Sequence, residues 1–261
     1  MKYTPKLPDE KVNNPKENLF LTAIKLMVSL AIVVSVVYAV LLFAVDFTVE
    51  HLSVENEKRL MKYAQVDFDM NKSLESPYLQ AITDKLTKCA NLPYDIKTYI
   101  LEEDEVNAFA LPGGKIMVTR GMLKRLKNEN ELASVIGHEL GHFKHRDHLK
   151  GLGKSLVTSV IGMIVADNYG TAFATTLQVT DAKYSQSQEL DADIFGVDML
   201  NCAYGGVNGA ETLFARMDKG KSWKYFLASH PDFHKRVEKM REHIPQKGYP
   251  TDNPLLPLKR L

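Results

Sequence analysis

The feature that most restricts the fold of this chain is an uncharged stretch close to its amino terminus. Residues 26–45 (LMVSLAIVVSVVYAVLLFAV) contain no Asp, Glu, Lys or Arg. A helix of about 20 apolar residues crosses the ~30 Å hydrocarbon core of a bilayer, so this segment predicts a transmembrane anchor. A cleaved signal peptide would have a shorter apolar core and a small-residue cleavage site. A buried core helix is the other alternative, but twenty uncharged residues with almost no polar stripe leave such a helix no solvated face. The anchor is therefore the favoured interpretation.

The charges on either side of this stretch predict how it lies in a membrane. Lys16 and Lys25 precede it, whereas Asp46 and Glu50 follow it. Basic residues that flank a span are retained on the cytoplasmic side. We therefore expect residues 1–25 to be cytoplasmic and the rest of the chain to lie on the other side.

The remainder of the chain has the composition of one globular domain. The whole sequence has 33 Lys and Arg against 32 Asp and Glu, and 45% of its residues are hydrophobic. A net charge of +1 gives no basic field over the chain as a whole, so we expect no nucleic-acid partner. Residues 46–261 are sufficient for one domain with a sizeable core.

Local patterns predict an α+β domain after the anchor. Residues 47–73 have apolar side chains at helical spacing and predict a linker helix, and Ser76-Pro77 predicts a second helix that runs to about Cys89. From Gly121 onward the pattern is largely helical. Strand-like runs occupy 95–101, 106–111 and 115–119, the last two joined by a Pro-Gly-Gly turn. We divide the chain into an amino-terminal segment, an anchor, a linker, a domain and a tail: 1–25, 26–45, 46–75, 76–245 and 246–261.

A second apolar region, residues 156–179, is interrupted by Asp167, Asn168 and Gly170. Each half is too short to cross a bilayer alone. The pattern favours a buried helical hairpin. The alternative is a hairpin that enters the membrane or covers the functional site.

The two cysteines, Cys89 and Cys202, are far apart and belong to no Cys/His cluster, so nothing supports a zinc finger. The sequence favours two separate buried thiols. Pairing is the alternative if the domain faces an oxidising compartment.

The strongest chemical signal is the HExxH pattern His138-Glu139-Leu140-Gly141-His142. Asn128 and Glu131 provide a capping box for a helix that would carry it. Two histidines four residues apart share one helix face, so both imidazoles can bind one Zn²⁺. Glu139 would lie beside the metal and take a proton from a water molecule held there.

A catalytic zinc needs a third protein ligand. His148 has the spacing of the HExxHxxGxxH motif, but position 145 is His rather than Gly, and we identify nothing between His142 and His148 that stops the helix. His145 and His148 are therefore expected at the surface or behind the ligands. Glu189 is the better candidate ligand. Asp193, four residues later, would accept the free ring N–H of a ligating histidine.

Four motifs in this order resemble the gluzincin peptidases of the HtpX and CaaX-prenyl-protease group, especially their single-anchor bacterial envelope members. The motifs are 107–114 (NAFALPGG), HELGH, ELDAD, and Ser229-His230-Pro231 with Arg236. The resemblance covers about residues 50–245. It implies an α+β fold in which a mainly helical zincin-type metallopeptidase domain with a small β-sheet follows one transmembrane helix. It also implies one Zn²⁺ per chain, bound by His138, His142 and Glu189.

The resemblance implies further roles for individual residues. His230 would stabilise the transition-state oxyanion or bind the resting zinc as a fourth ligand, with Arg236 in the same cluster. Residues 108–111 would form an edge strand to which an extended substrate adds by backbone pairing. The expected substrate-binding residues are Asn107, Ala108, Phe109 and Ala110.

The expected function is a membrane-anchored zinc endopeptidase for misfolded or unassembled envelope proteins. It would be a single-pass protein of the bacterial inner membrane with a periplasmic catalytic domain. One alternative is a non-catalytic, chaperone-like assembly factor with the same fold, and another is a soluble secreted peptidase. The chain lacks the multiple spans of the integral-membrane members, which argues against a prenylated or intramembrane substrate.

Overall fold

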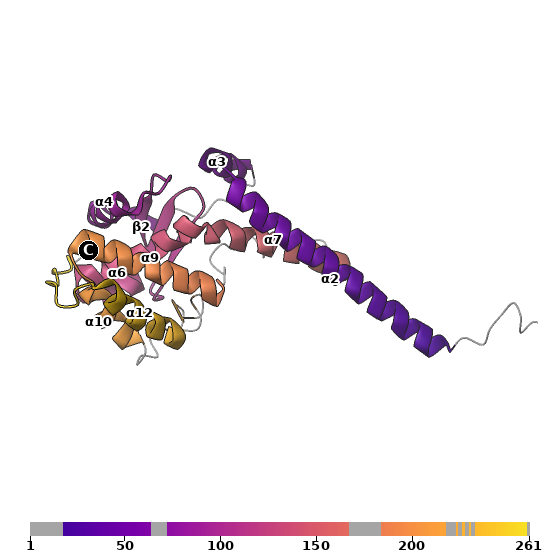
Figure 1. Cartoon of the computed structure of the whole chain (residues 1–261). Coiled ribbons are helices and arrows are strands. Elements are labelled where there is room, and N and C mark those ends of the chain that lie inside the picture. The colour runs from indigo at the N-terminus through magenta and orange to yellow at the C-terminus, as the bar shows by residue number, and fades with distance from the viewer. Residues whose placement is uncertain are drawn as a thin grey trace, which may run out of the picture. The chain divides into compact units, whose positions relative to one another are not determined.

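A computed structural model describes residues 18–63, 72–166, 184–217, 223, 226–227, 230 and 233–259 (Figure 1). The chain divides into two compact units, Met1–Ala44 and Val45–Leu261. The first unit consists, in its described part, of most of helix α2, and the second contains the rest of the fold.

Helix α2 (Leu19–His51) contains the predicted anchor and extends beyond it at both ends. Among the described residues it is the one helix long and apolar enough to cross a membrane. Its apolar side chains are exposed, for example Leu26 at 66% and Leu30 at 65%. Such a continuous apolar surface fits hydrocarbon rather than water. Residues 1–17 of the predicted cytoplasmic segment lie outside the described residues.

The linker helix predicted over 47–73 is not continuous. Its first residues belong to α2, which ends at His51, and a separate helix, α3 (Val54–Tyr63), follows. The break occurs because the Ser53 hydroxyl accepts a hydrogen bond of 3.2 Å from the Asn56 N–H and thereby begins a new helix. Residues 64–71 lie outside the described residues, and the end of the predicted helix is a short strand.

The described residues form a four-stranded sheet with the order β1-β2-β4-β3. The strands are β1 (Ser73–Glu75), β2 (Lys97–Leu101), β3 (Ala108–Leu111) and β4 (Lys115–Thr119). β2 and β4 run parallel, and the other two pairs are antiparallel. The three predicted strands are confirmed with slightly later starts for two of them. β1 was not predicted because three residues show no alternation.

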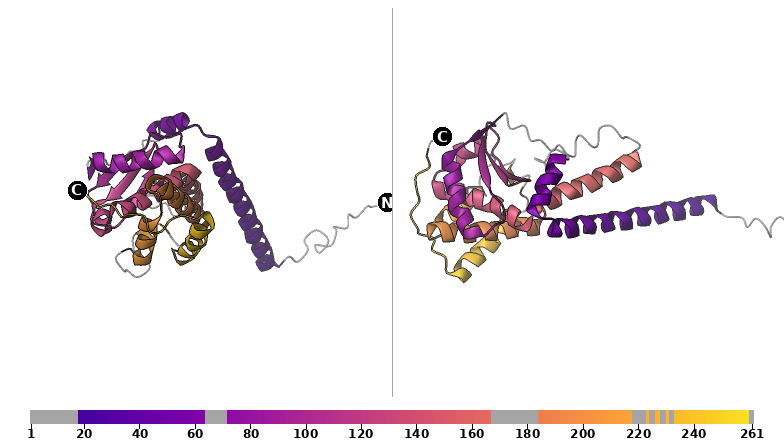
Figure 2. Two further views of the ribbon diagram at one scale, coloured as in Figure 1. Left: turned by 60° about the vertical axis from the view of Figure 1, so that its left-hand side comes forward. Right: turned by 90° about the horizontal axis from the view of Figure 1, so that it is seen from above.

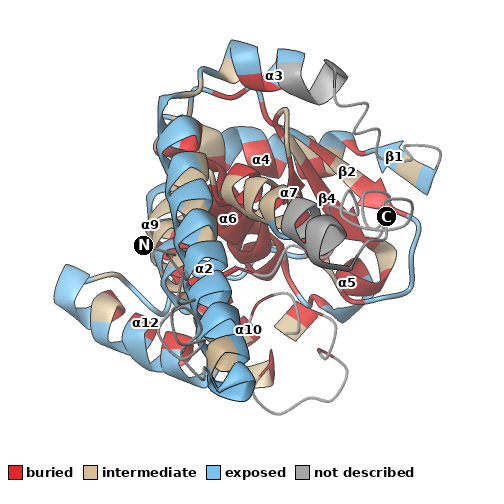
Figure 3. Cartoon of the chain, turned by 90° about the vertical axis from the view of Figure 1, so that its right-hand side faces the viewer, coloured by how far each residue is buried: buried red, intermediate tan, exposed pale blue. Residues whose placement is uncertain are grey.

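Helix α6 lies at the centre of the second unit, and its residues from Asn130 to Phe143 are all buried (Figure 3). Around it and the sheet are six further helices with described bounds: α4 (Pro77–Ala90), α5 (Arg120–Arg125), α7 (Asp147–Ala166), α9 (Gln186–Tyr204), α10 (Asn208–Met217) and α12 (Phe233–Lys247). The predicted mainly helical α+β domain is confirmed.

Small residues allow α9 to pack tightly along α6 (Figure 2). A Cβ added at Gly141 would lie 2.6 Å from the Cα of Ala192, and one added at Gly137 would lie 3.1 Å from the carbonyl oxygen of Gly196. The two helices therefore meet almost backbone to backbone. This contact brings the HExxH motif on α6 close to the ELDAD motif on α9.

A disulfide joins Cys89 on α4 to Cys202 on α9, with an S–S distance of 2.03 Å. The expectation of two separate buried thiols was therefore wrong. The reason is tertiary: α4 packs against α9 and brings together residues separated by 113 positions, which no local pattern reveals. Neither side chain is buried.

The second apolar region is described only in part. α7 includes residues 156–166, and residues 167–183 lie outside the described residues. The predicted hairpin is therefore not seen as a whole. At the other end of the chain, the predicted tail packs back on the start of α6, where the Asn130 side chain bonds Pro254 O and Leu256 N.

Candidate metal centre

Four buried side chains bring their ligand atoms to one point between α6 and α9. His138 and His142 come from α6, Glu189 comes from α9, and His230 comes from the segment that precedes α12. The four ligand atoms all lie within 4.8 Å of one another. The structure thus gathers the three predicted ligands and the predicted auxiliary histidine; Ser229 and Pro231 of the same motif lie outside the described residues.

The two histidines of α6 are held by carboxylates at their Nδ1 atoms. His138 Nδ1 donates to Asp193 Oδ1 at 2.8 Å, and His142 Nδ1 donates to Asp147 Oδ2 at 3.0 Å. In the neutral form, with the proton on Nδ1, the two imidazoles direct their Nε2 lone pairs at each other across 3.2 Å. Two lone pairs at this separation repel unless a metal ion or a proton lies between them.

The geometry of these donors fits zinc. Zn–N bonds of ~2.1 Å in a tetrahedron place neighbouring ligand atoms ~3.4 Å apart. His142 Nε2 lies 3.5 Å from Glu189 Oε1 and 3.2 Å from His138 Nε2. Two neutral imidazoles and a carboxylate are a common donor set for catalytic zinc.

Glu139 is fully buried next to this cluster. Neither of its carboxylate oxygens has a hydrogen-bond partner among the described residues, and the nearest basic atom, His230 Nε2, is 3.9 Å from Oε1. A buried carboxylate without partners is costly. Such a group is expected where it exchanges protons with water or substrate rather than where it supports the fold.

Arg236 joins the carboxylates behind the ligands. Its Nε and Nη2 donate to the two oxygens of Asp193 at 2.6 and 2.8 Å, and its Nη1 lies 2.6 Å from Glu189 Oε2. Nη1 also donates to His230 O at 3.1 Å. One guanidinium therefore contacts three members of the predicted site.

Burial and the neighbouring charges shift the pKa values of the residues in the site. Burial alone would raise the pKa of Glu189, but the charge of His230 and the hydrogen bond from His142 lower it far below its ordinary value. Burial lowers the pKa of His138. Burial also opposes protonation of His142, but Asp147 and Glu189 outweigh it and raise the pKa to about 9. Glu189 is thus an anion throughout the physiological range.

The helix carrying the motif stops earlier than expected. Arg146 has φ of 57°, and its N–H bonds to the carbonyls of His142 and Phe143, so α6 ends at His145. The expectation that nothing stops the helix before His148 was wrong. His148 is buried and lies 3.4 Å from Glu57 Oε1, outside the four-residue cluster, as expected of a non-ligand.

Three neighbours of the site were not predicted: Asp147, Tyr184 and Phe226. Asp147 could have been suspected, because an acid is unfavourable at the end of one helix but favourable in the first turn of the next. The Tyr184 ring stacks on His142 with centroids 3.8 Å apart, and the Phe226 ring lies 4.4 Å from that of His230. No spacing in the sequence marks these two aromatic residues.

The predicted substrate strand is β3, and it is an edge strand of the sheet within the described residues. It pairs with β4 on one side and contacts α6. Ala108 and Ala110 face the main core, whereas Phe109 belongs to a smaller apolar cluster. Asn107, just before the strand, accepts a hydrogen bond from the Ala108 N–H with its own side chain.

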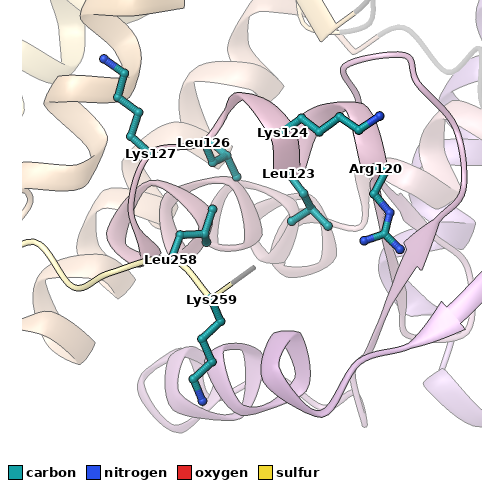
Figure 4. Close-up of a pocket in the computed structure, with 7 residues that line it drawn as sticks. All are labelled: Arg120, Leu123, Lys124, Leu126, Lys127, Leu258 and Lys259. Carbon is teal, nitrogen blue, oxygen red and sulfur yellow. The ribbon is translucent and has the colours of Figure 1, made fainter. Parts of the chain in front are cut away.

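A cavity of about 460 Å³ lies elsewhere, between α5 and the end of the chain (Figure 4). Its basic residues Arg120 and Lys124 are paired with Glu102 and Asp104. No residue of the metal cluster lines it. The cluster on α6 and α9 is therefore the candidate functional site.

An HExxH helix and a glutamate from a second helix define the class of metallopeptidases, together with a buried glutamate beside them that has no hydrogen-bond partner in the described part of the chain. The chain belongs to peptidase family M48, whose sequence profile matches residues 73–244. This match confirms the family predicted from the four motifs.

Several relatives have metalloprotease names. The mitochondrial metalloendopeptidase OMA1 of Arabidopsis thaliana is 33% identical over 52% of this chain and 29% of its own length. The metalloprotease LoiP of Escherichia coli is 27% identical over 77% of this chain and 86% of its own length. A protease HtpX homolog of Campylobacter concisus is 38% identical over 40% of this chain and 36% of its own length. The chain thus spans under a third of its plant relative and most of LoiP.

Proposed function

We propose that this protein is a membrane-anchored, zinc-dependent endopeptidase with one Zn²⁺ held by His138, His142 and Glu189. The observation that carries the proposal is the convergence of these three donors beside Glu139, whose buried carboxylate has no hydrogen-bond partner among the described residues. Zinc, when bound, would polarise the scissile carbonyl and acidify the attacking water.

Glu139 acts as the general base and acid in this proposal. It accepts the proton of the attacking water and returns it to the amine that leaves. The carboxylate is suited to this because no described hydrogen bond holds either oxygen. Asp193 and Asp147 keep the two imidazoles in the tautomer that presents Nε2 to the metal.

His230 has two roles in this proposal, one as a zinc ligand at rest and one as a hydrogen-bond donor to the oxyanion. Its Nδ1 lies 2.8 Å from Glu189 Oε1 and 3.2 Å from His138 Nε2, within the ligand cluster, which supports a fourth-ligand role at rest. Its Nε2 has no described partner and lies toward Glu139, where it could donate to a developing oxyanion. We propose that it alternates between these roles and that Arg236 holds its backbone in place.

The edge strand β3, which contacts the motif helix α6, supports a peptide substrate bound in extended form. We propose that an extended peptide pairs with β3, along Asn107, Ala108, Phe109 and Ala110, because an edge strand offers unpaired backbone groups. Misfolded or unassembled envelope proteins expose such segments. Substrates of this kind lie within reach of an enzyme tethered to the bilayer.

We also propose that the domain faces the periplasm, with the amino terminus in the cytoplasm and α2 in the bacterial inner membrane. The Cys89–Cys202 disulfide supports this, since disulfides persist in oxidising compartments. The lysines that precede the span support the same orientation. A second membrane contact is proposed through the apolar region 156–179, of which Leu156, Val157 and Thr158 on α7 are half-buried or exposed.

The test is casein cleavage by the full-length protein in detergent, wild type against Glu139→Gln. We expect the variant to retain zinc and to lose cleavage by about 10³-fold or more, while the exposed-site control Glu238→Gln behaves like wild type. Equal cleavage by Glu139→Gln would reject the mechanism. Absence of cleavage in zinc-loaded wild type, with binding of unfolded chains, would favour the assembly-factor alternative.

A further inference from the structure

The carboxyl end of helix α2 is hydrogen-bonded to Arg146, the residue that caps the end of helix α6. Arg146 caps α6 in a left-handed conformation, with φ of 57°, that favours glycine or asparagine. Its Nη1 donates a hydrogen bond of 2.7 Å to Val49 O and a second one to Leu52 O. These carbonyls lie at the carboxyl end of α2, where helical partners run out and a cation is favourable.

Further contacts join the same two parts of the fold. Two ion pairs connect the end of α2 to the first turns of α7: Lys150–Glu50 at 3.8 Å and Lys154–Asp46 at 3.3 Å. Gly153 lies against Val45, since a Cβ added there would come within 2.5 Å of Val45 Cγ1. Val45, Asp46 and Glu50 therefore lie against the helix that begins directly after Arg146.

The residue after Arg146 reaches the metal centre. Asp147 Oδ2 accepts from Nδ1 of the ligand His142 at 3.0 Å. Its other oxygen, Oδ1, accepts from Gln188 Nε2 at 2.7 Å, and Gln188 precedes the ligand Glu189. The backbone turn at Arg146 thus sets a carboxylate that contacts one metal ligand and the neighbour of another.

A second buried group links the helix after the anchor to the domain. Glu57 on α3 is fully buried. Its Oε1 accepts from the Gly113 N–H at 2.9 Å, in the turn that joins β3 to β4, and lies 3.4 Å from His148 Nε2. Its Oε2 accepts from the Tyr94 hydroxyl at 2.8 Å. Residues on both sides of the break at Ser53 are therefore tied to the domain.

We propose that residues 45–57, here called the juxtamembrane segment, position the metal centre, and that Arg146 is the positioning residue that connects them. The inference rests on the proposed zinc peptidase function. When the segment is docked, its carbonyls hold the guanidinium, and the left-handed turn fixes Asp147 against His142. When the segment is displaced, the turn relaxes and His142 loses the partner that orients its ring.

The experiment uses the full-length protein in detergent and compares Arg146→Gly with wild type. Glycine can adopt the left-handed turn without strain, but it lacks the guanidinium that holds this turn against Val49 O and Leu52 O. Asn91→Gly is the matched control, because Asn91 caps α4 with φ of 43°, is the other left-handed non-glycine residue in the described chain, and lies outside this network. Arg146→Lys, which keeps the charge, is the conservative variant.

The readouts are zinc affinity by competition with a chelator, and the visible absorption spectrum of the Co²⁺-substituted protein, which reports ligand geometry. We expect Arg146→Gly to bind zinc about tenfold more weakly, at the lower end of the effect of losing a partner of a metal ligand. Its Co²⁺ spectrum changes, and kcat for casein falls with KM unchanged. Arg146→Lys recovers part of the loss, and Asn91→Gly matches wild type.

A second variant, Gly153→Ala, displaces the juxtamembrane segment through Val45 while Arg146 stays intact, and we expect the same changes in a weaker form. Unchanged zinc affinity and Co²⁺ spectrum in folded Arg146→Gly would overturn the proposal. So would a change in Arg146→Gly with none in Gly153→Ala, because the effect would then belong to the helix cap alone. Zinc affinity and the Co²⁺ spectrum can be measured even if the wild type cleaves no casein. A failure of the proposed peptidase function is therefore distinguished from a failure of the present proposal.

Discussion

The Nδ1 atom of His142 lies 3.0 Å from Oδ2 of Asp147, five residues later and on a different helix. The separation is short because Arg146 ends α6 and turns the chain back. The Asp193–His138 pair has the same form, at 2.8 Å, but its partner comes from α9. Each histidine of the HExxH motif therefore has its own carboxylate. The partner of His142 follows the turn at Arg146, and the partner of His138 comes from α9, which is distant in sequence.

Replacement of Asp147 by Ala should weaken zinc binding. His142 would lose the acceptor that fixes its tautomer and its ring, and losing such a partner reduces metal affinity about 10–100-fold. Chelator competition measures the change. Asp191→Ala, an exposed acid on α9, is the matched control. Zinc affinity within twofold of wild type in Asp147→Ala would show that this hydrogen bond does not support the metal centre.

Replacement of Arg236 by Met should destabilise the domain. Arg236 is 2% exposed and pairs with Asp193 and Glu189, which would stay buried without the permanent positive charge that it supplies. Breaking a buried ion pair in this way costs about 3–5 kcal/mol. Urea unfolding of the zinc-free protein measures it, with the exposed Arg241→Met as control. A loss below about 1 kcal/mol would mean that the two carboxylates are not paired as the structure shows.

The stability contributed by Glu57 should depend on pH. Burial raises its pKa, but hydrogen bonds from His148, Gly113 and Tyr94 lower it below its ordinary value of 4.5. A depressed folded-state pKa gives stability that is present above the unfolded-state pKa and is lost as the pH falls through the folded-state value. The difference in unfolding free energy between wild type and Glu57→Gln should therefore be constant near pH 7 and shrink below about pH 4.5.

This comparison is made on EDTA-treated protein, so that loss of metal at low pH does not contribute. Urea titrations at several pH values between 7 and 3.5 give the two curves. A difference that stays the same over the whole range would show that the ionised form of Glu57 gains nothing from its partners.

Reduction of the Cys89–Cys202 disulfide should lower stability by about 2–4 kcal/mol, because a cross-link over a long loop restricts the unfolded chain. Thermal unfolding with and without dithiothreitol measures the change, and the Cys89→Ala/Cys202→Ala variant should show none on reduction. In cells, the thiols should resist a maleimide reagent until a reductant is added. Free thiols in the native protein would contradict both the bond and the periplasmic orientation that it supports.

Local signals were sufficient for the parts of the fold that local physics determines. Pro77 after a serine starts α4, the apolar run of β4 is a strand as predicted, and the uncharged residues 26–45 lie within one helix. The disulfide depends on the packing of α4 against α9, which is a tertiary fact. The strand β1 is three residues long and too short for a periodic pattern.

The same division applies to the site. His138, His142 and Glu139 follow from spacing on one helix, and Glu189 with Asp193 follows from spacing on another. His230 and Arg236 could be named only through a family resemblance, because a histidine before a proline has no distinctive pattern. Asp147 was overlooked because its contact with His142 depends on a left-handed turn at Arg146, and arginine rarely takes this conformation.

The most direct test of the central claim is the zinc content of purified full-length protein, measured by mass spectrometry after dialysis against metal-free buffer. Wild type and Glu139→Gln should each retain about one zinc per chain, since Glu139 is no ligand, whereas Glu189→Ala and His142→Ala should each retain little. Full zinc occupancy in Glu189→Ala and His142→Ala, or no zinc in folded wild type, would contradict the proposed metal centre.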